Sequence, residues 1–269
     1  MASLSTTRNE VFSSLAKIRN KVRKRRSRKE GHNVSAMKSL PNDLLLEVIA
    51  KVASNSFDDL CRIRQTCKEF KEAGQEDYIF QHVSIEKFPL FPLRKRKRFS
   101  ELMRRCQKCG NAEALYRQGV LDLFSLRKRY EFESGFECLE KAAAKGHIEA
   151  TYLYGVFLTC VGGEAKQQGL QSLCSLNSKN LSESRERFMT YIQSMWVNNV
   201  LVRKILAYND RVKACSQCGN LQNNFVTKRG WDDVYDEGDN LNGCGSCKMN
   251  REVNIFCDRL RSSTYVNSL

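Results

Sequence analysis

The sequence of 269 residues has only three prolines and three histidines, and it contains no long run of apolar residues. The prolines, Pro41, Pro89 and Pro92, all precede residue 93, so no proline interrupts helices in the later chain. Three scattered histidines leave few general bases, which argues against an enzyme. No segment approaches the roughly 20 apolar residues that span a bilayer, and no apolar secretory signal is evident. We therefore expect a mainly α-helical protein that does not enter a membrane.

Positive charge exceeds negative charge, with 45 Lys and Arg against 30 Asp and Glu and a net charge of +15. The excess lies in two blocks: residues 1–36 hold ten Lys or Arg and two Glu, and residues 94–108 hold eight Lys or Arg and one Glu. The first block predicts a disordered basic arm, either a solvated tail or a nuclear or polyanion-binding signal, with a transit peptide ranked last. We expect a location in the nucleus, the cytoplasm or both. Contact with nucleic acid is expected only as electrostatic attraction of this arm.

Residues 37–85 predict a compact helical unit. Pro41 suits the first turn of a helix, where its missing N–H leaves no bond unmade. A second helix is predicted from the helical spacing of Leu60, Ile63, Cys67 and Phe70. Two or three short helices bury little apolar surface. Part of the first helix is therefore expected to bind another protein. The apolar stripe of that first helix consists of Leu44, Leu45, Val48, Ile49 and Val52.

The stretch LPNDLLLEVIAKVASNSFDDLCRIRQTCKEFKEA, residues 40–73, resembles an F-box. The match rests on a Leu-Pro start with an Asp-Leu-Leu helix and on an Arg-x-x-Cys-Lys-x-Phe close. The connection ASNSFDD is longer than usual in that family, Phe70 stands where Trp is commoner, and an ordinary helical hairpin is the alternative. The resemblance implies docking on the Skp-type adaptor of a cullin–RING ubiquitin ligase. The adaptor-binding residues that it implies are Leu40, Pro41, Leu44, Leu45, Val48, Ile49, Cys67, Lys68 and Phe70.

The middle of the chain repeats itself. AEALYRQG (112–119) aligns with IEATYLYG (148–155) at an offset of 36, and GFECL (135–139) aligns with GLQSL (169–173) at an offset of 34. Small residues at fixed places let paired helices approach closely, and each unit buries its face only against a neighbour. The pattern resembles the Sel-one-like class of tetratricopeptide-related repeats. It predicts a short α-solenoid over 100–208 after a linker at 86–99, capped by helices near 99–103 and 188–206, with His147 structural.

Four cysteines near the end predict a structural zinc site. Twelve cysteines without a secretory signal indicate a reducing compartment, where paired cysteines more often bind metal than form disulfides. Two Cys-x-x-Cys pairs can complete one tetrahedral site of four thiolates, although their 25-residue gap exceeds the usual length and Cys257 could replace one ligand. We expect strands at 225–227 and 252–256, and hence a small β-rich zinc module over 209–269. The predicted ligands are Cys215, Cys218, Cys244 and Cys247.

Cys106 and Cys109 form a further pair, because CQKCGN copies the spacing of CSQCGN. A second zinc would need two more ligands, and the other cysteines available lie mostly at packing positions of the repeat helices. We favour two thiols at a helix terminus. The alternative is that this pair faces Cys244 and Cys247 in place of Cys215 and Cys218.

Taken in order, the F-box, the repeats and the Cys-rich end resemble a family of plant F-box proteins. That resemblance implies a non-catalytic substrate receptor of an SCF-type E3 ubiquitin ligase, with the repeats or zinc module binding a substrate protein of unknown identity. The alternative is a zinc-containing nucleic-acid-binding or scaffold protein of the nucleus. Against nucleic acid stand the acidic residues between the two Cys pairs, in WDDVYDEGD, because negative charge repels phosphates.

Overall fold

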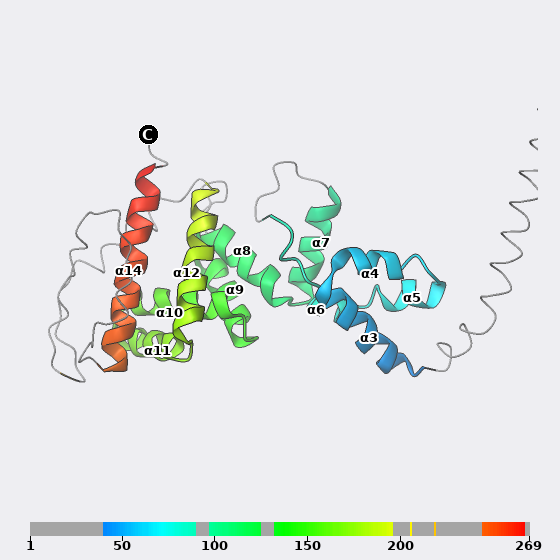
Figure 1. The fold of residues 1–269 in the computed structure, drawn as a ribbon, viewed down its shortest axis with the longest axis horizontal. Coiled ribbons are helices and arrows are strands. Elements are labelled where there is room, and N and C mark those ends of the chain that lie inside the picture. The colour runs from blue at the N-terminus through cyan, green and yellow to red at the C-terminus, as the bar shows by residue number, and fades with distance from the viewer. Residues whose placement is uncertain are drawn as a thin grey trace, which may run out of the picture.

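In the computed structural model, the described residues are 40–89, 97–124, 132–195, 205, 218 and 244–266. Every regular element in these ranges is an α-helix, which confirms a mainly helical fold. The helices are α3 (Asn42–Asn55), α4 (Phe57–Ile63), α5 (Lys68–Ala73), α6 (Asp77–His82), α7 (Lys97–Lys108), α8 (Ala112–Phe124), α9 (Phe132–Ala144), α10 (Ile148–Val161), α11 (Gly163–Cys174), α12 (Ser178–Gln193) and α14 (Gly245–Val266). Figure 1 shows them in an elongated arrangement with α3 towards one end and α14 at the other. Within the described part, no helix is both long and apolar enough to cross a membrane.

Helices α3 to α6 form an N-terminal unit, residues 40–89, with a core of its own. Ile49, Leu60 and Ile79 are at most 1% exposed in this core. The core is closed by α7, which contributes Leu102 and Cys106 to the same cluster. The predicted linker at 86–99 therefore ends earlier than expected, because α7 already begins at Lys97.

The second predicted helix of this unit is in fact two helices. Ser56 alone separates α3 from α4, and its side chain accepts a hydrogen bond from the Asp59 amide at 3.3 Å, so the long connection expected there does not exist. The chain then turns after α4, because the Thr66 hydroxyl donates to the Ile63 carbonyl at 2.7 Å. Cys67 is extended and starts α5. The sequence did not reveal this break, because the apolar residues from Leu60 to Phe70 keep helical spacing across it.

The two predicted repeats are antiparallel helix hairpins, α8 with α9 and α10 with α11. Glycines let the helices approach: a Cβ on Gly119 would lie 2.9 Å from the Gly135 carbonyl, and one on Gly169 would lie 2.6 Å from the Gly155 carbonyl. These four glycines occupy equivalent places in the two repeats. The repeat alignment is thus confirmed in three dimensions, since the aligned glycines make the same helix crossing.

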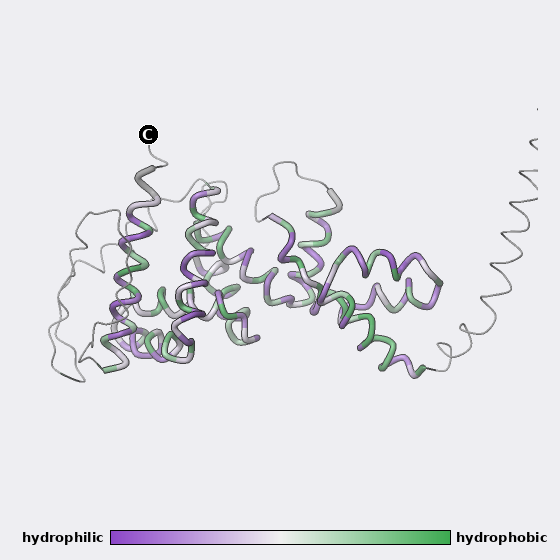
Figure 2. The backbone as a smooth tube through the Cα atoms, in the orientation of Figure 1, coloured by the Kyte–Doolittle hydropathy of each residue, from purple (hydrophilic) through white to green (hydrophobic). Residues whose placement is uncertain are grey.

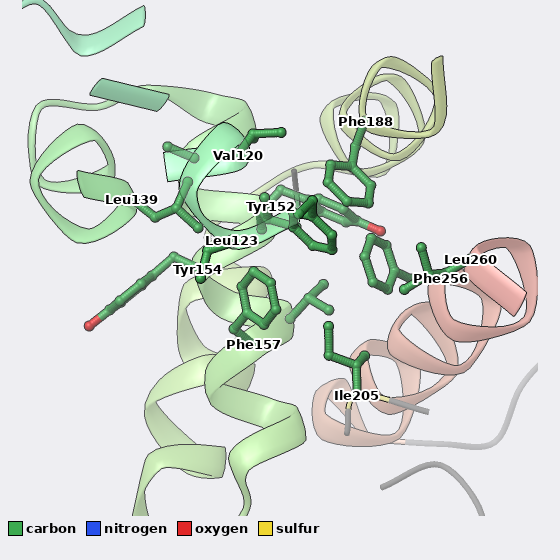
Figure 3. Close-up of a cluster of buried hydrophobic side chains, with 14 of the residues drawn as sticks. Val120, Leu123, Leu139, Tyr152, Tyr154, Phe157, Phe188, Ile205, Phe256 and Leu260 are labelled. Atoms are coloured by element: carbon green, nitrogen blue, oxygen red, sulfur yellow. The ribbon is translucent and has the colours of Figure 1, made fainter. Parts of the chain in front are cut away.

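A third helix pair, α12 with α14, closes the stack. Arg185 contacts Glu252 and Glu186 contacts Arg259, so residue numbers rise together along both helices and the pair is parallel. Phe256 and Leu260 of α14 point into the same cluster as Phe188, as Figure 3 shows. Parallel neighbours need a long connection, which residues 194–244 provide.

The strand predicted at 252–256 is wrong, because this stretch lies inside the 22-residue helix α14. Val253, Phe256, Cys257 and Leu260 are all buried, and their spacing of three, one and three residues is that of a helix face. The other predicted strand, at 225–227, lies outside the described residues. A β-rich terminal module is therefore not supported where the structure describes this region.

Candidate functional site

The outer face of α3 carries large apolar side chains that face water. Leu40 just before the helix is 37% exposed, Leu44 is 50% exposed and Val48 is 52% exposed. Leu44 and Val48 are four residues apart in α3 and so share one face of it, and Leu40 lies in the segment just before the helix. In Figure 2 much of α3 is green, at the end of the molecule far from α14. Because its other face supplies Ile49, Ala50 and Ala53 to the core, α3 is apolar on two sides, and one of them is uncovered.

The predicted adaptor-binding residues of α3 do not all share this outer face. Pro41 is exposed beside the stripe, and Leu45 is half-buried against the N-terminal core. Ile49 is 1% exposed and belongs to the core, so its assignment to a partner surface is corrected. Sequence period alone could not separate the faces, because leucine and isoleucine occur on both.

The predicted residues of α5 are placed mainly by local structure. The Cys67 sulfur accepts a hydrogen bond from the Phe70 amide at 3.4 Å and so starts the helix. Lys68 is exposed and lies 3.7 Å from Glu72, an ion pair of the kind that adds little stability. Phe70 is half-buried against the N-terminal core. Cys67 and Lys68 are therefore open to a partner, and Phe70 only in part.

Asn111 joins the N-terminal unit to the repeats. Its Nδ2 donates to the carbonyls of Phe80, Gln81 and Val83 at 3.1, 3.1 and 2.9 Å, and its Oδ1 accepts from the Ala114 amide at 3.0 Å. One buried side chain thus caps α8 and holds the end of α6. Sequence could have indicated the helix cap, since Asn is favoured there. It gave no sign of the three carbonyls, which lie some thirty residues away.

Buried charges strengthen the same junction. Arg117 is 2% exposed, donates to the Phe88 carbonyl at 2.7 Å and pairs with Glu113 at 2.5 Å. His147 accepts from the Ala150 amide through Nδ1, so its Nε2 carries the proton donated to Glu113 at 2.7 Å. Burial alone would raise the pKa of Glu113. The His147 hydrogen bond and the charges of Arg117 and Arg187 outweigh burial and lower that pKa. His147 is structural as predicted, yet it has the carboxylate partner that the sequence did not reveal.

Three of the four predicted metal ligands come together at the start of α14. The Cys218, Cys244 and Cys247 sulfurs lie within 4.8 Å of one another. Cys218 Sγ is 3.4 Å and Cys244 Sγ is 3.8 Å from Cys247 Sγ. Thiolates bound tetrahedrally to zinc at about 2.3 Å stand about 3.8 Å apart, so these separations suit ligands of one ion. The fourth predicted ligand, Cys215, lies outside the described residues.

The other cysteines stand apart from this cluster. Cys106 is fully buried in the N-terminal core, where burial and the neighbouring Cys109 raise its pKa to about 12. Among the described residues, Cys106 and Cys109 do not belong to a group of three potential ligands, so this pair suits packing better than metal binding. Cys257 is buried further along α14, on the repeat side, and its pKa is raised by a hydrogen bond with Cys160 and by burial. Its exchange for a zinc ligand, left open by the sequence, is incompatible with this position.

Comparison with known proteins supports both halves of the fold. Residues 37–86 match a family model described as F-box-like, and residues 85–193 match one described as plant tetratricopeptide repeats. The two matches meet where Asn111 and Arg117 hold the N-terminal unit. The narrower assignment of the repeats to the Sel-one-like class stays a prediction.

Several Arabidopsis thaliana proteins named as F-box proteins are similar to the chain. The putative F-box protein At1g67623 is 29% identical over 224 residues, which cover 80% of this chain and 74% of the relative. F-box protein At2g35280 is 28% identical over 129 residues, 48% of this chain and 77% of the relative. F-box protein At1g67340 is 25% identical over 120 residues, 44% of this chain and 31% of the relative. No solved structure matches the chain.

Proposed function

We propose that the chain is a substrate receptor of an SCF-type cullin–RING ubiquitin ligase, because it matches an F-box-like model and a plant tetratricopeptide-repeat model and is similar to Arabidopsis thaliana F-box proteins. The N-terminal unit binds a Skp-type adaptor, and through it a cullin. The repeats or the region around the thiol cluster hold a substrate protein. The chain itself supplies binding surfaces and no reacting group.

The exposed stripe of Leu40, Leu44 and Val48 is the observation that carries this proposal. Burying such side chains is worth about 1.5–3 kcal/mol each, so leaving three of them in water is unfavourable unless a partner covers them. The N-terminal unit does not need them for its own core, to which α3 contributes Ile49, Ala50 and Ala53 and α7 contributes Leu102 and Cys106. The stripe is thus an apolar surface on a unit that is already folded.

Binding to a purified Skp-type adaptor tests the proposal. The double variant Leu44→Asp, Val48→Asp places two charges in the stripe, and its affinity is expected to fall at least ~100-fold, as for hot-spot residues. Both side chains face water, so circular dichroism and the melting temperature should change little. Val161→Asp is the matched control, since Val161 is 64% exposed on α10 of the repeats. Wild-type affinity in the double variant would exclude the stripe as the adaptor site.

We also propose that Cys218, Cys244 and Cys247 hold one structural zinc, with Cys215 as fourth ligand. Four thiolates leave no open coordination position, so the ion would stabilise the fold and carry out no chemistry. Elemental analysis of the full chain purified under reducing conditions is expected to give one zinc per molecule, and less in Cys244→Ser. Retention of full zinc by that variant would place the metal elsewhere.

A nuclear location is proposed from the basic arm, residues 1–36. A fluorescent fusion of the full chain is expected to enter the nucleus. Replacement of the seven Lys and Arg in KVRKRRSRK, residues 21–29, by Gln should shift it to the cytoplasm. If the distribution does not change, the arm is a solvated tail and not a nuclear signal.

A further inference from the structure

We propose that the thiol cluster is a clasp which keeps α14 docked on the repeats, so that the third helix pair is complete only when metal is bound. The inference rests on the zinc site proposed above and adds what that ion controls. It assigns the cluster a conformational role at the far end of the repeat stack from the adaptor surface.

The first turn of α14 lacks the negative charge that the repeat helices have. Helices α8, α9, α10 and α11 each carry a glutamate as their second residue: Glu113, Glu133, Glu149 and Glu164. Such a charge stabilises a helix N-terminus, where unpaired amides accumulate. The first turns of α12 and α14 have no acidic residue, but the N-terminus of α12 is capped by the Asn177 side chain. Metal-bound thiolates from Cys244 and Cys247 would supply that charge at the same place.

The cluster lies where α14 meets the second repeat. A Cβ on Gly245, between the two ligands, would lie 3.8 Å from the sulfur of Cys174, the last residue of α11. The first turn of α14 therefore packs on the end of α11. Cys174 itself is not among the sulfurs that gather at the cluster.

The connection between α12 and α14 also favours a clasp. Residues 194–244 separate the two helices in the sequence, and Cys218 and Cys244 are 26 positions apart. An ion bound by Cys218, Cys244 and Cys247 would join these two positions. Closing a loop before the helix docks reduces the conformational freedom that docking would otherwise remove.

Docking of α14 depends on charges that must be brought together. Arg185 has a side chain only 3% exposed and donates to Glu252 Oε2 at 2.6 Å, and the buried Tyr152 donates to Glu252 Oε1 at 2.8 Å. Partial separation of a buried pair of this kind is strongly destabilising, because each charge loses its partner before it regains water. Loss of the clasp should therefore release α14 as a unit and expose this pair to water.

Hydrogen–deuterium exchange on the full chain tests the clasp, with zinc bound and after removal by a chelator. Amides of α14 and α12 are expected to exchange at least ~10-fold faster after removal, and those of α3 to α6 less than about twofold faster. Added zinc should restore protection. Cys244→Ser should behave like the chelated wild type even in zinc, whereas the matched control Cys174→Ser should behave like the untreated wild type.

Zinc content and adaptor affinity measured on the same samples separate the possible failures. One zinc per chain with unchanged α14 exchange after its removal overturns the clasp and leaves the zinc site standing. Absence of zinc overturns both. Adaptor affinity should be equal with and without zinc, because α3 lies at the other end of the molecule (Figure 1), and a large change would overturn the separation of the two sites.

Discussion

Helices α3 and α10 are both 14 residues long and both rich in apolar side chains, but their surroundings differ. α10 buries nine residues, because α9, α11, α12 and α14 all contact it. α3 buries three and leaves Leu44 and Val48 about half exposed. Apolar composition alone therefore does not distinguish a fully buried helix from one with an exposed apolar face. What differs is how completely the neighbouring helices enclose each one, because α10 buries nine residues and α3 buries three.

The largest expected effect tests whether α14 packs against α10 and completes the core around it. Glu252→Ala removes the partner of buried Arg185 and of Tyr152, and should lower the free energy of unfolding by about 3–5 kcal/mol. Asp59→Ala breaks the exposed pair with Arg62 in the N-terminal unit and should cost about 0.5 kcal/mol or less. Urea denaturation measures both. Equal losses would contradict the burial of the first pair.

Truncating a leucine to alanine in each of the two helices sharpens the comparison directly. Leu153 of α10 is fully buried, so Leu153→Ala should cost about 2–5 kcal/mol of unfolding free energy. Leu44→Ala should cost about 0.5 kcal/mol or less, because that side chain is half exposed in the folded protein. The affinity for the adaptor should show the opposite pattern: it should fall in Leu44→Ala and stay unchanged in Leu153→Ala. Comparable destabilisation by the two variants would mean that α3 is covered in solution.

Much of the fold around α10 was predictable and much of that around α14 was not. The aligned glycines at 119 and 155 predicted the hairpins, because a position without a side chain is needed wherever two helices cross closely. Residues 252–256 were assigned to a strand because Val, Ile and Phe occur together there. The helical spacing from Val253 to Leu260 was equally present, and packing against Phe188 made it the relevant one.

The two candidate sites were predictable to different degrees. Cys-x-x-Cys spacing predicted that Cys244 and Cys247 lie within reach of one ion, but it did not predict that they stand at the start of a helix. The sequence indicated that α3 carries an apolar stripe, but it did not separate the buried Ile49 from the exposed Leu44 and Val48. The contacts of Asn111 and of His147 with Glu113 join residues some thirty positions apart, and no local pattern encodes such partners.

A third effect concerns how closely the helices around α10 can approach. In a helix Ala is ordinarily better than Gly by about 1 kcal/mol. Gly169→Ala should nevertheless destabilise by about 1–3 kcal/mol, since its Cβ would lie 2.6 Å from the Gly155 carbonyl. Gly245→Ala is the matched control, because its Cβ would meet only Cys174 at an ordinary 3.8 Å. Thermal unfolding should show opposite signs, and stabilisation by Gly169→Ala would disprove the close crossing.

The smallest expected effect is a pH dependence of stability caused by Glu113, which is hydrogen-bonded to His147 at the start of α10. The pKa of Glu113 is lowered in the folded protein from its ordinary value of 4.5, because the His147 hydrogen bond and the Arg117 and Arg187 charges outweigh burial. A lowered pKa gives stability that is present above pH 4.5 and is lost as pH falls through the folded value. Glu113→Gln should weaken the dependence of the unfolding free energy on pH in the acid range, here called the acid limb. Glu47→Gln, an exposed acid of α3, should leave that limb unchanged, and equal limbs for all three proteins would contradict the assignment.

The four hydrogen bonds of Asn111 have a mechanical consequence. They join the end of α6 to the start of α8. Arg117 of α8 also donates to the carbonyl of Phe88, further along the chain from α6. Bending at this joint would have to break several buried hydrogen bonds at once, so these bonds oppose it. They would thereby limit the range of distances and angles between α3 and α14.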